Sequence, residues 1–82
     1  MKYRIWDKRK ISFANTLKEI ENKDKKVIMK YVGRDALKQK TYVFDIIQIG
    51  DDLFIIMNDT DPYIKGLKNS KTMGNIFKGV KI

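Results

Sequence analysis

The chain contains no cysteine and no histidine, and it has a single proline. These absences exclude disulfides, zinc sites built on thiolate or imidazole, cysteine nucleophiles and the most common general base at neutral pH. The sequence also has no glycine-rich phosphate loop and no nucleophile motif. We therefore expect a protein that is not an enzyme and that has no cofactor and no metal site.

Long apolar segments are also absent. The longest uninterrupted apolar run has only a few residues, whereas roughly 20 are needed to cross a bilayer. The segment Met1–Asp7 lacks the apolar stretch of a signal peptide. We therefore expect no membrane partner and a cytoplasmic location for one domain spanning residues 1–82, which must rely on packing or self-association for stability.

Carboxylates are missing from the last part of the chain. The net charge is +8, and the last acidic residue is Asp61. Residues 62–82 form a basic, glycine-punctuated segment that either packs on the rest of the domain or trails from it. Two interpretations of the charge remain open: a surface that attracts acidic partners, or the solubility of a lysine-rich protein.

The apolar pattern is mainly that of short strands. Alternation or β-branched and aromatic residues predict strands over 2–6, 11–13, 27–32, 41–49, 53–58 and 73–77. A short helix is predicted from Asn15, with Leu17 and Ile20 on one face. Five or six short strands with glycine-containing turns favour a mainly β fold, a small SH3-like, partly open barrel with one short helix.

The strands over 41–49 and 53–58 form the strongest prediction, a hairpin closed by Gly50-Asp51-Asp52. The stretch from Phe44 to Met57 is so apolar that we expect this hairpin to be buried on both faces or to lie at an interface, and a homodimer through it is one alternative. Asp45 lies inside this stretch. Because an unpaired buried carboxylate is costly, we expect it to accept backbone hydrogen bonds or to meet a lysine or Arg4.

The candidate binding residues are basic, with one tyrosine beside them. They are Lys8, Arg9, Lys10, Tyr63, Lys65, Lys68 and Lys71. The last three lysines recur at every third position, so a helical turn would place them on one positive face, and a loop would make them a cationic arm. Tyrosines beside lysines can stack on bases; for Trp6, Tyr31 and Tyr42 the pattern favours core packing.

Four short segments in chain order carry a family resemblance. They are Lys2–Lys8, Met29–Gly33, Tyr42–Ile47 and Met73–Phe77. In the same order, the YopX family of phage and prophage proteins has Lys-Phe-Arg-Ala-Trp-Asp, Met-Gln-Tyr-Thr-Gly-Leu, Tyr-Glu-Gly-Asp-Ile-Val and Ile-Gly-Asn-Ile-Tyr. The chain resembles a shortened, divergent member of that family.

The resemblance implies a mainly β fold with SH3-like barrel character and supplies no catalytic residues. It also implies that Phe44 replaces a family glycine before Asp45, so that the turn there is reshaped or gains an apolar contact.

The function expected from these observations is binding. The leading hypothesis is a phage or prophage accessory protein in the host cytoplasm, an anti-defence or host-takeover inhibitor. Its partner would be an acidic macromolecule, either a host protein or a nucleoprotein complex. Direct binding of nucleic acid and self-association as a structural module are the alternatives.

Overall fold

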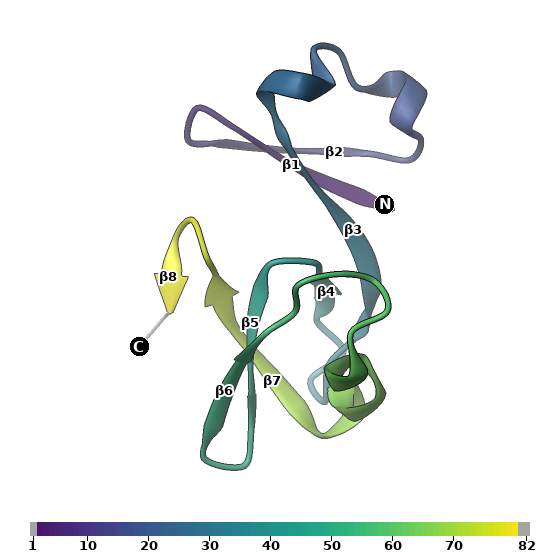
Figure 1. Ribbon diagram of the computed structural model, residues 1–82. Helices are drawn as coiled ribbons and strands as arrows, with labels where there is room; N and C mark the ends of the chain where they lie inside the picture. The colour runs from purple at the N-terminus through teal and green to yellow at the C-terminus, as the bar shows by residue number, and fades with distance from the viewer. Residues whose placement is uncertain (1, 81–82) are drawn as a thin grey trace.

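The computed structural model describes residues 2–80, which form eight strands and three short 3₁₀ helices, labelled η (Figure 1). The elements follow the chain in this order: β1 (Tyr3–Asp7), β2 (Lys10–Ala14), η1 (Leu17–Glu19), η2 (Lys23–Lys25), β3 (Val27–Arg34), β4 (Lys40–Tyr42), β5 (Asp45–Ile49), β6 (Asp52–Ile55), η3 (Pro62–Asn69), β7 (Ser70–Asn75) and β8 (Gly79–Val80).

The strands form two antiparallel sheets. The first has the order β2-β1-β3-β4, and the second has the order β6-β5-β7-β8. In Figure 1, β1 and β2 lie above the second sheet, and β3 runs down from them to β4, which lies at the level of the second sheet. The fold class expected from the sequence, a mainly β, small, partly open barrel, is confirmed, since one sheet is curled into a half-barrel. The main helical segment is η3, which lies at a different place in the chain from the helix expected after Asn15.

Each sheet has a small apolar core of its own. In the first, Ile5 and Ala14 pack against Ile20, which comes from the segment between β2 and β3. In the second, Ile47 packs with Leu67 of η3 and with further side chains. Neither core is large, so the contact between the sheets must contribute to holding the domain together.

The predicted helix from Asn15 is wrong. The structure has only the single turn η1, and Leu17, which was expected on the buried face, is 44% exposed. Only Ile20 reaches the core, because the segment lies across the sheet as an irregular cover. One 3₁₀ turn provides too few backbone hydrogen bonds to form an amphipathic helix.

The predicted hairpin around Gly50 is formed by β5 and β6, with Ile49 opposite Asp52 and with Gly50 at a φ of 62°. The continuous strand predicted over 41–49 is wrong, because a tight turn at Val43 and Phe44 divides it into β4 and β5. This division and the addition of β8 give eight strands where five or six were expected.

Phe44 occupies this turn with a φ of 73°, a left-handed backbone that glycine adopts at least cost. Its ring also meets Phe77 edge-on, with 6.3 Å between ring centroids. The turn therefore keeps a conformation suited to glycine and adds an apolar contact. Left-handed backbone at a non-glycine residue costs roughly 1–2 kcal/mol.

The expectation that the whole hairpin is buried on both faces is wrong for this chain. β6 is an edge strand of the second sheet, and Leu53, Ile55 and Met57 on or just after it are 53%, 40% and 58% exposed. Side chains alternate across a strand, so the intervening Phe54 and Ile56 face the core.

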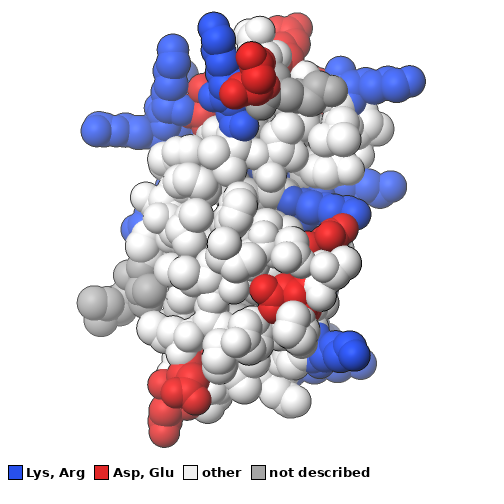
Figure 2. All heavy atoms as spheres, in the orientation of Figure 1, with Lys and Arg blue, Asp and Glu red and all other residues white. Residues whose placement is uncertain are grey.

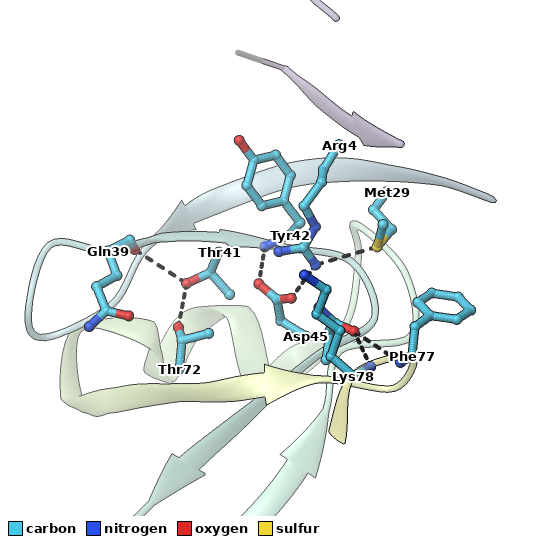
Figure 3. A network of polar contacts seen from close by, with 10 residues as sticks. Arg4, Met29, Gln39, Thr41, Tyr42, Asp45, Thr72, Phe77 and Lys78 are labelled. Atoms are coloured by element: carbon cyan, nitrogen blue, oxygen red, sulfur yellow. Dashed lines mark hydrogen bonds and ion pairs between the residues drawn. The ribbon is translucent and has the colours of Figure 1, made fainter. Parts of the chain in front are cut away.

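An ion pair between Arg4 of β1 and Asp45 of β5 connects the two sheets (Figure 3). The carboxylate also accepts a hydrogen bond from the backbone N–H of Tyr42 at 2.9 Å, and the guanidinium lies 4.7 Å from the Tyr42 ring centroid. The exposed fractions are 12% for the Arg4 side chain and 1% for that of Asp45. The partner predicted for Asp45 is thus confirmed.

Asp35 supplies a second link between the sheets. Its carboxylate accepts hydrogen bonds of 2.9 Å from the backbone N–H groups of Leu37, Gln39 and Thr72, and Thr72 lies on β7. Burial opposes ionisation of Asp35, but the hydrogen bonds, led by that from Thr72, outweigh it and hold its pKa below the ordinary value. Nearby, the hydroxyls of Thr41 and Thr72 lie 2.9 Å apart.

Replacement of Asp35 by Asn should lower the free energy of unfolding at pH 7 by about 1–3 kcal/mol, because an amide cannot accept all three backbone hydrogen bonds. The folded-state pKa of Asp35 is lowered, so its stabilisation is present above the unfolded pKa and is lost as the pH falls through the folded pKa. The unfolding free energies of Asp35→Asn and wild type, measured with urea, should therefore begin to converge as the pH falls below about 4 and should agree once it is below the folded pKa. The control Asp51→Asn, at an exposed turn residue, should have the unfolding free energy of wild type at every pH. A loss of stability in Asp35→Asn that does not change with pH would contradict this account.

Replacement of Arg4 by Met should lower the free energy of unfolding at pH 7 by about 3–5 kcal/mol, because Asp45 is left buried without its cation. Burial already raises the pKa of Asp45, and the hydrogen bonds from Arg4 and the Tyr42 N–H offset part of that rise. A raised folded pKa means that ionisation costs stability as the pH increases through it, and loss of Arg4 makes this cost larger.

The loss in Arg4→Met should therefore be smaller in acid, where Asp45 is neutral, and Asp45→Asn in the same chain should restore part of the stability. Urea unfolding of the single and double variants at pH 7 and about pH 4 measures both effects. Equal losses at the two pH values, with no recovery in the double variant, would show that the ion pair is not what stabilises this contact.

Candidate functional site

The net charge is concentrated in the first sheet. Residues 1–42, which include that sheet, contain 13 basic and 5 acidic residues, whereas residues 43–82 contain 5 of each. The whole excess of +8 therefore belongs to the first sheet and its loops. In Figure 2, many Lys and Arg side chains project from the end formed by the first sheet, with acidic side chains among them, and the opposite half shows acidic side chains with further basic ones at its right.

The predicted residues Lys8, Arg9 and Lys10 lie at the turn between β1 and β2, and all three are exposed. Lys8 and Arg9 have φ values of 44° and 73°. Two consecutive left-handed residues are the mark of a two-residue hairpin turn that normally favours Asn-Gly. The turn thus carries two long cationic side chains at positions where smaller residues would be less strained.

The predicted residues Tyr63, Lys65 and Lys68 lie on η3, and Lys71 lies on β7. A 3₁₀ helix has three residues per turn, so Lys65 and Lys68 share one face. Asp61 begins η3 by accepting a hydrogen bond from the backbone N–H of Tyr63 at 3.0 Å. The segment 62–80 is packed on the second sheet, since Leu67 is buried and β7 is a central strand.

The structure does not bring these two predicted groups together. The turn between β1 and β2 lies at the upper left of Figure 1, and η3 lies at the lower right. The ring of Tyr63 packs against that of Phe54 at an interplanar angle of 31°, with 4.3 Å between ring centroids, so part of the ring is already covered. Each group is a separate cationic surface.

A groove between the two sheets brings other cations together. This inter-sheet groove has a volume of about 310 Å³, and its lining includes Arg4, Lys40, Lys78, Phe13 and Asp45. In Figure 3 the Lys78 side chain points towards the Arg4–Asp45 pair. The backbone of the turn that carries Lys78 is held by Asn75, whose side-chain amide oxygen accepts hydrogen bonds from the backbone N–H groups of residues 77 and 78, both at 2.9 Å.

A second groove lies at the edge of the first sheet. This edge groove has a volume of about 400 Å³ and is lined by Lys2, Asn15, Tyr31, Arg34 and Lys40. Its lining contains three cations and no carboxylate. Lys40 lines both grooves, so the two adjoin at this residue.

Arg34 and Lys40 are directly opposite each other in the register of β3 and β4. Like charges placed opposite each other in a sheet are destabilising. Within residues 2–80 the ion pairs are Arg4–Asp45 and Lys30–Asp59, so no carboxylate offsets this repulsion. Arg34 uses one N–H to bind the backbone oxygen of Lys38 at 2.7 Å, which orients the guanidinium while its charge remains uncompensated.

Aromatic rings lie beside these cations. Phe13 on β2 is 51% exposed, and its ring centroid is 6.3 Å from that of Tyr42. Tyr31 meets Tyr42 edge-on at 5.7 Å and is half-buried. Tyr42 itself is buried, in agreement with the core packing predicted for it, and it fixes the two outer rings.

Sequence reasoning missed Lys2, Phe13, Arg34 and Lys40 as site residues. Phe13 was assigned to the short strand over 11–13 without a role in binding, and no element was predicted between residues 32 and 41. One feature of the sequence could have indicated this site: residues 36–40 contain two lysines and no acidic residue. Only the pairing of β3 with β4 shows that Arg34 and Lys40 face each other.

The acidic residues Asp59 and Asp61, which line neither groove, have partners within the fold. Asp61 accepts backbone hydrogen bonds from Met57 and Tyr63, and Asp59 pairs with Lys30 at 2.8 Å. In the part of the chain that the structure describes, no three acidic side chains gather as a metal site would require. No helix within residues 2–80 has the length and apolar character needed to cross a membrane.

Comparisons of the chain with protein-family models, with curated proteins and with solved structures gave no match. The resemblance to the YopX family therefore stays a prediction from the four segments, and the function must be argued from the geometry.

Proposed function

We propose that this protein is a non-enzymatic binding protein that engages an acidic macromolecule through its first sheet. The observation that carries the proposal is the edge groove, where Lys2, Arg34 and Lys40 converge without a carboxylate. Natural surfaces usually intersperse charges of both signs. A concave surface of one sign concentrates its potential and attracts a partner of the opposite sign.

The resemblance to phage and prophage proteins supplies the biological setting for this proposal. In that setting the protein is an accessory factor in the host cytoplasm, and the acidic partner is a host protein or nucleoprotein complex that it alters or blocks. A small surface with positive potential and no reactive side chain suits inhibition by occupation of a site. It does not require chemistry on the target.

The location of the binding surface can be tested with two charge-reversal variants. Arg34→Glu/Lys40→Glu changes the edge groove, and Lys65→Glu/Lys68→Glu changes η3 by the same net charge. We expect the first variant to elute from immobilised heparin at markedly lower salt than the second, and to bind labelled polyglutamate about tenfold or more weakly than wild type.

Thermal unfolding of both variants serves as the control for folding. Equal losses in the two variants would contradict placement of the site on the first sheet. Failure of the wild-type protein to bind either polymer at low salt would contradict the proposed function itself, since screening is weakest there.

A second candidate function, self-association, is favoured by the edge strand β6. Leu53, Ile55 and Met57 expose apolar surface along one side of this strand. An edge strand also presents unpaired backbone donors and acceptors to which a second strand can bind. Antiparallel pairing of β6 with β6 of a second copy would bury the apolar side chains, would pair the free backbone groups of the edge and would form a symmetric dimer.

Light scattering over a range of protein concentrations tests this candidate. We expect the apparent mass of a self-associating protein to rise from the 9.7 kDa of one chain to twice that value, and we expect Ile55→Lys to abolish the rise, because a lysine on an edge strand opposes pairing. Leu37→Lys, at an exposed position outside β6, is the matched control. A mass that stays at one chain at every concentration would exclude self-association.

A further inference from the structure

The inter-sheet groove and the edge groove adjoin at Lys40, and together they form one open path along the first sheet. The path contains the side chains of Lys2, Arg34, Lys40 and Lys78, and none of these is in an ion pair among the described residues. Its single carboxylate, Asp45, is buried and paired with Arg4.

We propose that a single-stranded nucleic acid binds along this path, with phosphates at the four unpaired cations and bases against Phe13 and Tyr31. This inference rests on the proposed function and names the chemical class of its partner. It goes beyond general attraction to acidic surfaces, because it assigns a role to the two aromatic rings.

The distribution of charge suits an extended anion. The four cations come from the start of the chain, from β3, from β4 and from the turn between β7 and β8. Lys2, Arg34 and Lys40 line the edge groove and Lys78 lines the inter-sheet groove, so a single compact anion could not pair with all four. A polyphosphate backbone carries a charge at every nucleotide and can match a series of such contacts.

The aromatic rings distinguish a nucleic acid from an acidic protein. Phe13 keeps half of its surface exposed next to Arg4 and Lys40 in the inter-sheet groove, and Tyr31 lines the edge groove beside Arg34. An exposed Phe gains nothing from a carboxylate, whereas base–aromatic stacking contributes substantially at each base. Contact with Tyr42 holds both rings in place before a ligand arrives.

The same rings favour a single strand over a duplex. The bases of a duplex are stacked on each other, so their faces are not available to Phe13 or Tyr31. The longest helix among the described residues is η3, an eight-residue 3₁₀ helix on the second sheet. The cationic first sheet thus has no helix of the kind that enters a major groove.

Fluorescence anisotropy with three labelled probes tests the inference. The probes are an oligo-dT of about 12 nucleotides, a size that small barrels cover, a duplex of the same length, and polyglutamate. Wild type should bind the oligo-dT more tightly than the duplex. The log–log slope of the oligo-dT affinity against salt should be near −3, since each of four phosphate contacts contributes about −0.7.

Phe13→Leu keeps an apolar side chain but removes the stacking surface. It should weaken oligo-dT binding by about fivefold or more and should leave polyglutamate binding unchanged. Tyr63→Leu, which removes an exposed ring on η3, is the matched control and should bind like wild type. Lys40→Gln should reduce the magnitude of the salt slope by about 0.7, and circular dichroism should confirm that each variant is folded.

The outcomes separate this inference from the proposed function. Tighter binding of the duplex than of the oligo-dT would overturn the single-strand assignment. An unchanged oligo-dT affinity in folded Phe13→Leu would overturn it as well. In either case the proposal of an acidic partner would stand. Failure of all three probes to bind at low salt would overturn both the single-strand assignment and the proposed function. Loss of oligo-dT binding alone in Phe13→Leu, with the expected change of slope in Lys40→Gln, would support the path.

Discussion

The ion pair between Arg4 and Asp45 is the contact on which the arrangement of the two sheets depends. Each sheet has only a small apolar core of its own, and an 82-residue chain has little surplus stability. The pair brings β1 to the start of β5, and Asp45 simultaneously accepts the Tyr42 N–H within the turn that separates β4 from β5. One carboxylate thus fixes both a local turn and a long-range contact. Loss of the Asp45 carboxylate would therefore affect the turn and the contact between the sheets together.

The division of charge follows the division into sheets, and this has an energetic consequence. Repulsion among the cations of the first sheet opposes folding, and the second sheet contributes no net charge to offset it. Lys30 and Asp59 form an exposed ion pair between residues 1–42 and residues 43–82, and exposed ion pairs contribute little to stability. The opposed Arg34 and Lys40 therefore remain a cost to the free protein. A partner with negative charge would relieve that cost, which links the stability of the fold to occupancy of the grooves.

Much of the fold could be predicted from the sequence, but most of the candidate site could not. Local signals were sufficient for the hairpin at Gly50. The cost of burying Asp45 predicted backbone donors, a lysine or Arg4 as its partner, and the structure shows Arg4 together with the Tyr42 N–H. The residue pattern over 41–49 wrongly predicted a continuous strand, because Phe44 adopts a left-handed φ that its residue type disfavours. Only the family glycine at this position in the resemblance indicated a turn there. The edge groove arises from the pairing of β3 with β4. Charges separated in sequence converge only through such register, which local patterns do not encode.

The ion pair also determines the electrostatics of the inter-sheet groove. Asp45 is the one acidic residue in its lining, and an unpaired carboxylate there would repel a phosphate. Arg4 neutralises it at the base of the groove, while the Nε of Arg4 is buried without a hydrogen-bond partner among the described residues. Lys40 and Lys78 are then the charges that a ligand encounters. The contact that joins the sheets therefore also adds to the positive charge of the groove between them, because without Arg4 the carboxylate of Asp45 would offset one of the two lysines.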